Sequence, residues 1–127
     1  MFERLYLDME EKFLSRVNYE FITAICRMLG ISTRIRWSMD YRLVEGKTER
    51  LLDLCIQAGA TEYLSGPAAK AYLDEKLFAE KGISVRYMDY SGYPEYKQLF
   101  PPFVHEVSIM DLLFNEGPDA TTYMKSF

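Results

Sequence analysis

The sequence is poor in the residues that mark several classes of protein. It has only two cysteines and one histidine in 127 residues. Cys26 and Cys55 each lie in a stretch of helical apolar periodicity, which favours reduced core thiols over a disulfide framework or a zinc site. No cluster of histidine, cysteine and carboxylate residues has the spacing of metal ligands. We therefore expect no metal and no cofactor.

Long apolar runs and an excess of basic charge are also lacking. No run approaches the roughly 18 to 20 residues of a membrane span, and residues 1–14 alternate charged and apolar side chains instead of forming a signal-peptide core. Lysine and arginine number 15 against 19 acidic residues, a net charge of −4. The scattered basic residues do not form a phosphate-tracking surface. These absences predict a cytoplasmic protein that binds neither nucleic acid nor a membrane, and the length fits one domain over residues 1–127.

Tyrosine, in contrast, is abundant, with ten residues in the chain. A tyrosine hydroxyl needs a partner or water, so tyrosines tend to lie at half-buried positions, cleft walls and interfaces. Many of them fall at predicted strand ends, in a predicted helix or in a long loop: Tyr63, Tyr72, Tyr87, Tyr90, Tyr93 and Tyr96.

The apolar periodicity predicts four helices. They cover residues 17–29, a segment capped by Thr48 and ending at Gly59, residues 68–81 after the Ser65-Gly66-Pro67 turn, and a last helix that begins with a capping box at Ser108. Alternating segments predict strands over residues 31–37, 61–64 and 83–87. Strands that alternate with helices indicate βαβ crossovers. We therefore expect an α/β fold: a small three-layer domain with a short, mostly parallel three-stranded sheet flanked by four or more helices.

Ligands of such sheets bind outside the carboxyl ends of the strands. Residues that follow the predicted strands are therefore candidate ligand contacts: Lys47, Thr48, Arg50, Tyr63, Ser65 and Gly66. Ser65 and Gly66 could hold a phosphate or carboxylate at a helix start, or Ser65 could serve only as an N-cap. Lys47 and Arg50 would add positive charge for an anion, or be ordinary solvated side chains.

The segment from residue 89 to 107 is rich in glycine, proline and aromatic residues, which predicts an ordered flap. It contains Tyr96, Gln98 and the single histidine, His105. Asp89 and His105 are candidates for general acid–base catalysis. The alternatives are that Asp89 only forms a turn and that His105 is an ordinary loop residue. No spacing is diagnostic of an enzyme, so that question stays open.

Several motifs in this order resemble the C-terminal half of the WbqC-like family. They are residues 46–55, residues 63–74, Tyr96 with Gln98, and residues 108–118. The resemblance implies a role in bacterial surface polysaccharide (O-antigen) biosynthesis, with group transfer to a nucleotide-linked sugar as one reaction. Lys47, Thr48, Arg50, Ser65, Gly66, Tyr96 and Gln98 are among its motif positions. The chain departs from the family at Phe100-Pro101-Pro102 and at His105, and family proteins are about twice as long.

Two functions follow from these observations. In the first, the edge of the sheet binds an anionic sugar nucleotide or acyl donor and the flap closes over it. In the second, the chain is a non-catalytic ligand-binding or oligomerisation module. Such a module would form a homodimer, or associate with the missing N-terminal half, through exposed aromatic side chains.

Overall fold

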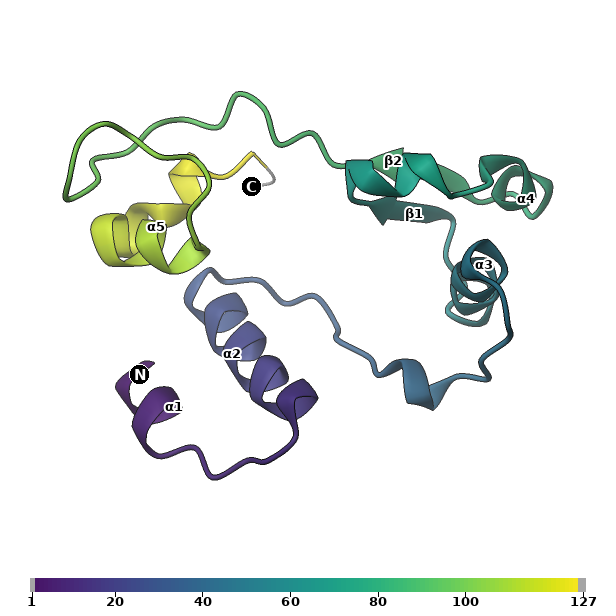
Figure 1. The fold of residues 1–127 in the computed structure, drawn as a ribbon, viewed down its shortest axis with the longest axis horizontal. Coiled ribbons are helices and arrows are strands. Elements are labelled where there is room, and N and C mark those ends of the chain that lie inside the picture. Colours follow the sequence, from purple (N-terminus) through teal and green to yellow (C-terminus); the bar gives the residue numbers. More distant parts are fainter. Residues whose placement is uncertain (1, 126–127) are drawn as a thin grey trace. The chain divides into compact units, whose positions relative to one another are not determined.

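A computed structural model describes residues 2–125 of the chain (Figure 1). Within these residues it has five α-helices, two β-strands and three short 3₁₀ helices, and it divides into two compact units. Unit 1 comprises residues 2–34 and 92–125, and unit 2 comprises residues 35–91. The expected organisation as one domain over residues 1–127 stays a prediction.

Unit 2 is built around two parallel strands. Strand β1 (Glu62–Ser65) pairs with β2 (Ser84–Tyr87) in a register that places Glu62 opposite Ser84 and Ser65 opposite Tyr87. Helix α3 (Lys47–Gln57) precedes β1, and helix α4 (Glu75–Glu80) connects the strands. The two later predicted strands, their parallel pairing and the α/β class are confirmed.

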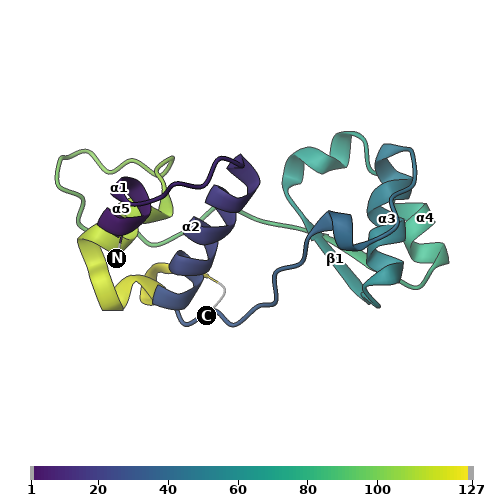
Figure 2. The same cartoon turned by 90° about the horizontal axis from the view of Figure 1, so that it is seen from below.

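The core of unit 2 lies on one face of this sheet. Phe78 of α4 is fully buried there with Leu52 of α3, and its ring stacks on Tyr63 of β1 at 5.4 Å between centroids. Figure 2 shows α3 and α4 beside the strands. On the opposite face Arg86 and Glu62 form an exposed ion pair of 3.3 Å. Unit 2 therefore has two layers, and the predicted third layer is not formed by its residues.

The predicted third strand is also missing. Residues 31–37 have no regular secondary structure, although their sequence alternates as expected of a strand. A strand requires a partner that satisfies its backbone groups, and the ladder that the structure describes contains only β1 and β2. The segment crosses the boundary between the two units at residues 34 and 35. The expectation of a three-stranded sheet was wrong. Alternating apolar and polar residues indicate which face of a segment can be buried, but they do not indicate whether another strand pairs with it.

The predicted helix over residues 68–81 is divided in two. A 3₁₀ helix, η2 (Pro67–Ala71), is followed by buried Leu73, and α4 begins after Asp74. The Asp74 carboxylate accepts a hydrogen bond of 3.0 Å from the Lys76 amide and so caps α4. The burial of Leu73 in the core and the cap at Asp74 therefore favour two short helices over the single helix that the apolar periodicity predicts.

The cap of α3 was also assigned to the wrong residue. Gly46 occupies the N-cap position with φ +93°, a conformation that favours glycine. Thr48 lies inside the first turn of α3 and is buried.

Unit 1 is helical. Helices α1 (Phe2–Leu7), α2 (Leu14–Met28) and α5 (Ile109–Glu116) enclose a core of Phe2, Leu29, Leu112, Leu113 and Ala120. A 3₁₀ helix, η3 (Gly117–Tyr123), follows α5. The sequence predicts α2 and α5 but not the short α1. Among the described residues, no helix has both the length and the apolar character that crossing a bilayer requires.

Candidate functional site

The carboxyl ends of the two strands in unit 2 form one edge of the sheet. The Met88 amide, just after β2, donates a hydrogen bond of 2.8 Å to the Ser65 carbonyl. Gly66 follows Ser65, and the Cβ atom of a side chain placed at Gly66 would lie 3.7 Å from the Tyr90 hydroxyl oxygen. The structure thus brings Ser65, Gly66 and Tyr90 together, at the edge where parallel sheets bind ligands.

The N-termini of α3 and α4 lie at the same edge. Glu75, the first residue of α4, accepts a hydrogen bond from Tyr87 at the end of β2, and Thr48, in the first turn of α3, accepts one from the Asp74 amide at the start of α4. An open pocket of ≈ 620 Å³ lies at the start of α3, lined by Gly46, Lys47, Arg50, Leu51 and Tyr72. Two of the predicted ligand contacts, Lys47 and Arg50, therefore line one pocket. It also contains Tyr72, which belongs to the tyrosine excess and to the motif of residues 63–74 but was not a predicted ligand contact.

Cations lie over tyrosine rings at this edge. The Lys47 ammonium is 5.8 Å from the ring centroid of Tyr72, and the Lys70 ammonium is 4.9 Å from that of Tyr87. Arg50 donates from Nε to the Val44 carbonyl at 2.9 Å, which fixes its side chain. Lys70 was missed in the sequence, where its only signal is its place just after the Ser65-Gly66-Pro67 turn.

The acidic groups near these cations have other partners. The Tyr87 hydroxyl donates a hydrogen bond of 2.7 Å to Glu75, while Asp74 caps α4. Burial, followed by the bond to Glu75, raises the pKa of Tyr87 to about 12. Tyr87 therefore stays neutral at physiological pH and adds no negative charge to the edge.

Thr48 and Tyr63 contribute to the structure of unit 2. The Thr48 hydroxyl donates to the Tyr72 carbonyl at 3.3 Å and accepts from the Asp74 amide at 3.2 Å. Tyr63 stacks on Phe78 in the core. Ligand contact stays a prediction for both residues, but the Thr48 hydroxyl is already occupied by the backbone.

Ser65 ends β1 and does not cap the following helix. The N-cap of η2 is Gly66, without a side-chain hydrogen bond, and Pro67 takes the first helical position as predicted. The alternative that Ser65 serves only as an N-cap was wrong. Gly66 has an ordinary φ of −71°, so its backbone does not require glycine.

Asp89 forms a local turn. Its Oδ1 accepts hydrogen bonds from the Ser91 amide at 2.9 Å and the Ser91 hydroxyl at 2.7 Å. This geometry matches the turn-forming alternative. Proton transfer by Asp89 stays a prediction.

Tyr96 and Gln98 meet Asp111 of α5 in unit 1. The Tyr96 hydroxyl donates to Asp111 Oδ2 at 2.6 Å, and the Gln98 amide donates to the same oxygen at 3.0 Å. Gln98 also bonds both backbone groups of Val104, at 2.9 and 2.8 Å. Burial and the bond to Asp111 raise the pKa of Tyr96.

This network orders the segment predicted as a flap. It also changes the role expected of Asp111, whose carboxylate binds the flap instead of completing a capping box. Ser108 does cap α5, as predicted, by accepting from the Met110 amide at 3.3 Å.

His105 lies near one acidic side chain. Its Nε2 is 3.8 Å from a Glu95 carboxylate oxygen, and its ring packs edge-on against Phe103 at 4.7 Å. Its side chain is 55% exposed. His105 belongs to unit 1, whereas Asp89 belongs to unit 2.

Residues 2–125 contain no group of three or more His, Cys, Asp or Glu side chains that could hold a metal ion. Cys26 and Cys55 are both free and half-buried. Burial raises the pKa of the Cys55 thiol, which disfavours the reactive thiolate.

Two comparisons with known proteins found a match. The model of the WbqC-like protein family matches residues 1–123. The chain is 52% identical over 121 residues to the uncharacterized protein Rv1507c of Mycobacterium tuberculosis, a match that covers 95% of this chain and 52% of that protein. The chain thus spans about half the length of this curated relative. No solved structure matches. The chain belongs to the WbqC-like protein family.

Proposed function

We propose that this protein acts in bacterial surface polysaccharide (O-antigen) biosynthesis by binding a nucleotide-linked sugar at the carboxyl edge of unit 2. Group transfer to that sugar is the proposed reaction. Membership of the WbqC-like family supports the proposal, as does the pocket that Lys47, Arg50 and Tyr72 line. The proposed role implies a cytoplasmic location.

The chemistry of the pocket suits a nucleoside diphosphate. Lys47 and Arg50 supply two positive charges for a pyrophosphate, and the terminal nitrogens of Arg50 have no hydrogen bond within the described part of the chain. The half-exposed Tyr72 ring offers a flat surface on which a nucleobase can stack. The volume of ≈ 620 Å³ lies within the range of small-molecule sites.

Calorimetric titration with UDP-glucose, compared with pyrophosphate and uridine alone, tests this proposal. We expect Lys47→Gln and Arg50→Lys each to weaken binding by about five- to tenfold, because each removes one charged or bidentate contact. Lys81→Gln, at the opposite end of α4, is the matched control and should change nothing. Equal losses in all three variants, or no binding at millimolar UDP-glucose, would contradict a nucleotide site here.

The roles of Asp89 and His105 in proton transfer belong to the same proposal. Neither residue lines the pocket, so Asp89→Asn and His105→Gln should leave UDP-glucose binding within about twofold of the wild-type value. A larger loss of binding in either variant would make that residue a ligand contact instead.

The second candidate is an interaction module, which exposed apolar side chains of unit 1 favour. Leu99 and Phe100 are 78% and 76% exposed, and they follow Gln98, which is fixed to Val104 and Asp111. Apolar side chains presented on an ordered loop are typical of interfaces. The partner would be a second copy, or a polypeptide that corresponds to the rest of the longer relative.

Sedimentation velocity from 1 to 100 μM tests the homodimer, with Leu99→Ser and Phe100→Ser as disrupting variants. A strict monomer that also binds UDP-glucose would contradict the homodimer and leave the first proposal intact.

A further inference from the structure

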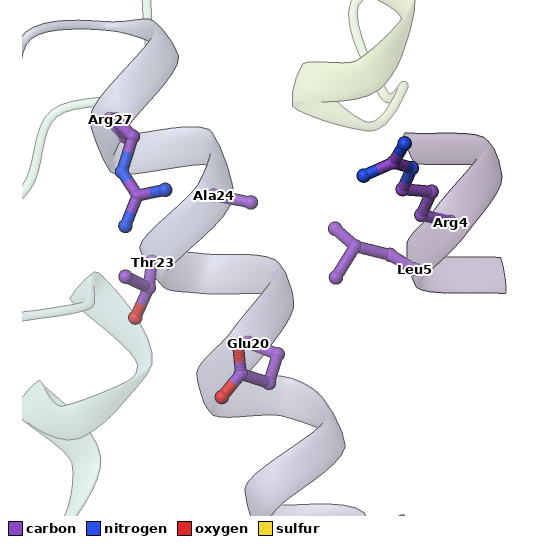
Figure 3. A pocket seen from close by; sticks show the side chains of 6 residues that line it. All are labelled: Arg4, Leu5, Glu20, Thr23, Ala24 and Arg27. Atoms are coloured by element: carbon purple, nitrogen blue, oxygen red, sulfur yellow. The ribbon is translucent and has the colours of Figure 1, made fainter. Parts of the chain in front are cut away.

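Unit 1 has a pocket of its own between helices α1 and α2 (Figure 3). Its volume is ≈ 480 Å³, and it is lined by Arg4, Leu5, Glu20, Thr23, Ala24 and Arg27. The pocket lies outside unit 2 and shares no residue with the nucleotide site proposed above.

The packing of α1 on α2 fixes the walls of this pocket. Tyr6 of α1 meets Phe21 of α2 edge-on at 4.9 Å, and Leu5 packs against the core of unit 1. The wall formed by α2 consists of residues 20, 23, 24 and 27, which share one face of a helix. Figure 3 shows the Arg4 and Leu5 side chains extending from α1 toward α2, with Leu5 and Ala24 facing each other across the space between the helices and Arg27 lying along α2.

The pocket has two arginines and one acidic side chain, Glu20. Among residues 2–125, neither Arg4 nor Arg27 has an ion-pair partner within 4.0 Å, whereas Arg16 on the same helix α2 pairs with Glu11 at 3.5 Å. Two guanidinium groups that line one pocket repel each other unless an anion lies between them. The hydroxyl of Thr23, another lining residue, is buried and has no hydrogen-bond partner among the described residues.

We propose that this pocket binds a small organic monocarboxylate. Guanidinium groups match the two oxygens of a carboxylate and form bidentate hydrogen bonds with it. Leu5 and Ala24 provide an apolar surface for the attached hydrocarbon. With Glu20 the pocket has a net charge of about +1, which favours a monoanion over a phosphate dianion. The proposal rests on unit 1 alone and does not depend on the nucleotide site.

NMR titration of the ¹⁵N-labelled chain with sodium butyrate tests the proposal, with sodium chloride at equal ionic strength as the blank. We expect saturable shifts at Leu5, Thr23 and Ala24 with a millimolar dissociation constant. Acetate, which lacks two methylene groups, should bind at least threefold more weakly. Inorganic phosphate that binds more tightly than butyrate would overturn the assignment to a carboxylate.

Three variants and one control separate the site from non-specific charge attraction. Arg4→Gln and Arg27→Gln should each weaken butyrate binding by at least fivefold, while Glu20→Gln should strengthen it by about two- to threefold. Arg16→Gln, which removes the same charge from the same helix but outside the pocket, should leave binding unchanged. Circular dichroism checks that each variant is folded. An equal effect of Arg16→Gln and Arg27→Gln, or weaker binding by Glu20→Gln, would overturn the proposal.

Discussion

The hydrogen bonds of the Thr48 hydroxyl allow a specific test of what stabilises unit 2. Thr48 is 6% exposed, and its hydroxyl bridges the Tyr72 carbonyl and the Asp74 amide. These bonds connect α3 to the segment between η2 and α4, where the predicted helix is interrupted. Replacing Thr48 by valine keeps the shape and the β-branch of the side chain but removes both bonds.

The expected loss follows from the two backbone groups left without a partner. A net hydrogen bond contributes roughly 0.5 to 1.5 kcal/mol, and a buried group left unsatisfied costs about 1 to 3 kcal/mol. Distances of 3.3 and 3.2 Å are at the long end of the range, which argues for the lower half of these values. We therefore expect Thr48→Val to lower the free energy of unfolding of unit 2 by about 2 kcal/mol.

Urea denaturation followed by tryptophan fluorescence measures this change selectively, because the only tryptophan, Trp37, lies in unit 2. Thr48→Ser retains the hydroxyl and should cost about 1 kcal/mol or less, for the lost methyl group. Thr122→Val, at an exposed position in unit 1, should leave the transition unchanged. A Thr48→Val transition within 0.5 kcal/mol of wild type would refute the structural role of the hydroxyl.

Three further predictions concern the backbone, the pH dependence and the flap. Gly66→Ala should leave the urea midpoint unchanged, whereas Gly46→Ala should lower the free energy of unfolding by about 1 to 2 kcal/mol, because Gly46 has a positive φ and Gly66 does not. The pKa of Tyr87 is raised to about 12, against about 10 in the unfolded chain, so the folded state favours the protonated hydroxyl. The resulting contribution of Tyr87 to the free energy of unfolding is complete below pH 10 and is lost as the pH rises from about 10 to 12. Urea midpoints from pH 8 to 12 should therefore fall less steeply in Tyr87→Phe. Gln98→Ala should speed amide hydrogen exchange at Val104 about tenfold or more, as measured by NMR, because that amide loses its acceptor.

The parts of the fold that could be predicted are those with a strong local signal. The apolar stripe of α2, the β-branched and aromatic alternation of β1 and β2, and the Ser108 cap all depend on neighbouring residues, and each is present. Residues 31–37 alternate as well, but no strand among the described residues pairs with them. Pairing depends on distant residues, which a pattern within one segment does not report. The break at Asp74 did have a local signal, an aspartate followed by Glu75 in a first helical turn.

Prediction of the candidate site had the same limit. The rule for parallel sheets placed Ser65 and Gly66 after the strand that the structure has as β1, but it placed Lys47 and Arg50 after a strand over residues 31–37 that is not formed; these two residues lie instead in the first turn of α3 and line the pocket there. The rule could not tell which hydroxyl or amide is already used by the backbone. That depends on contacts between residues far apart in sequence, such as Thr48 with Asp74.

These backbone contacts divide the motif residues into two groups. Segments without strands or helices leave backbone groups that no ladder satisfies, and polar side chains bind them instead. Gln98 holds both backbone groups of Val104, and Gln57 does the same for Arg42 at 3.1 and 2.8 Å. A glutamine in this arrangement replaces a neighbouring strand. Ligand contact by Gln98 stays a prediction. The Lys47 ammonium and the terminal nitrogens of Arg50, in contrast, have no hydrogen bond to the backbone of the described residues. Their charges therefore remain available to a ligand, and the proposed nucleotide site depends on these two side chains.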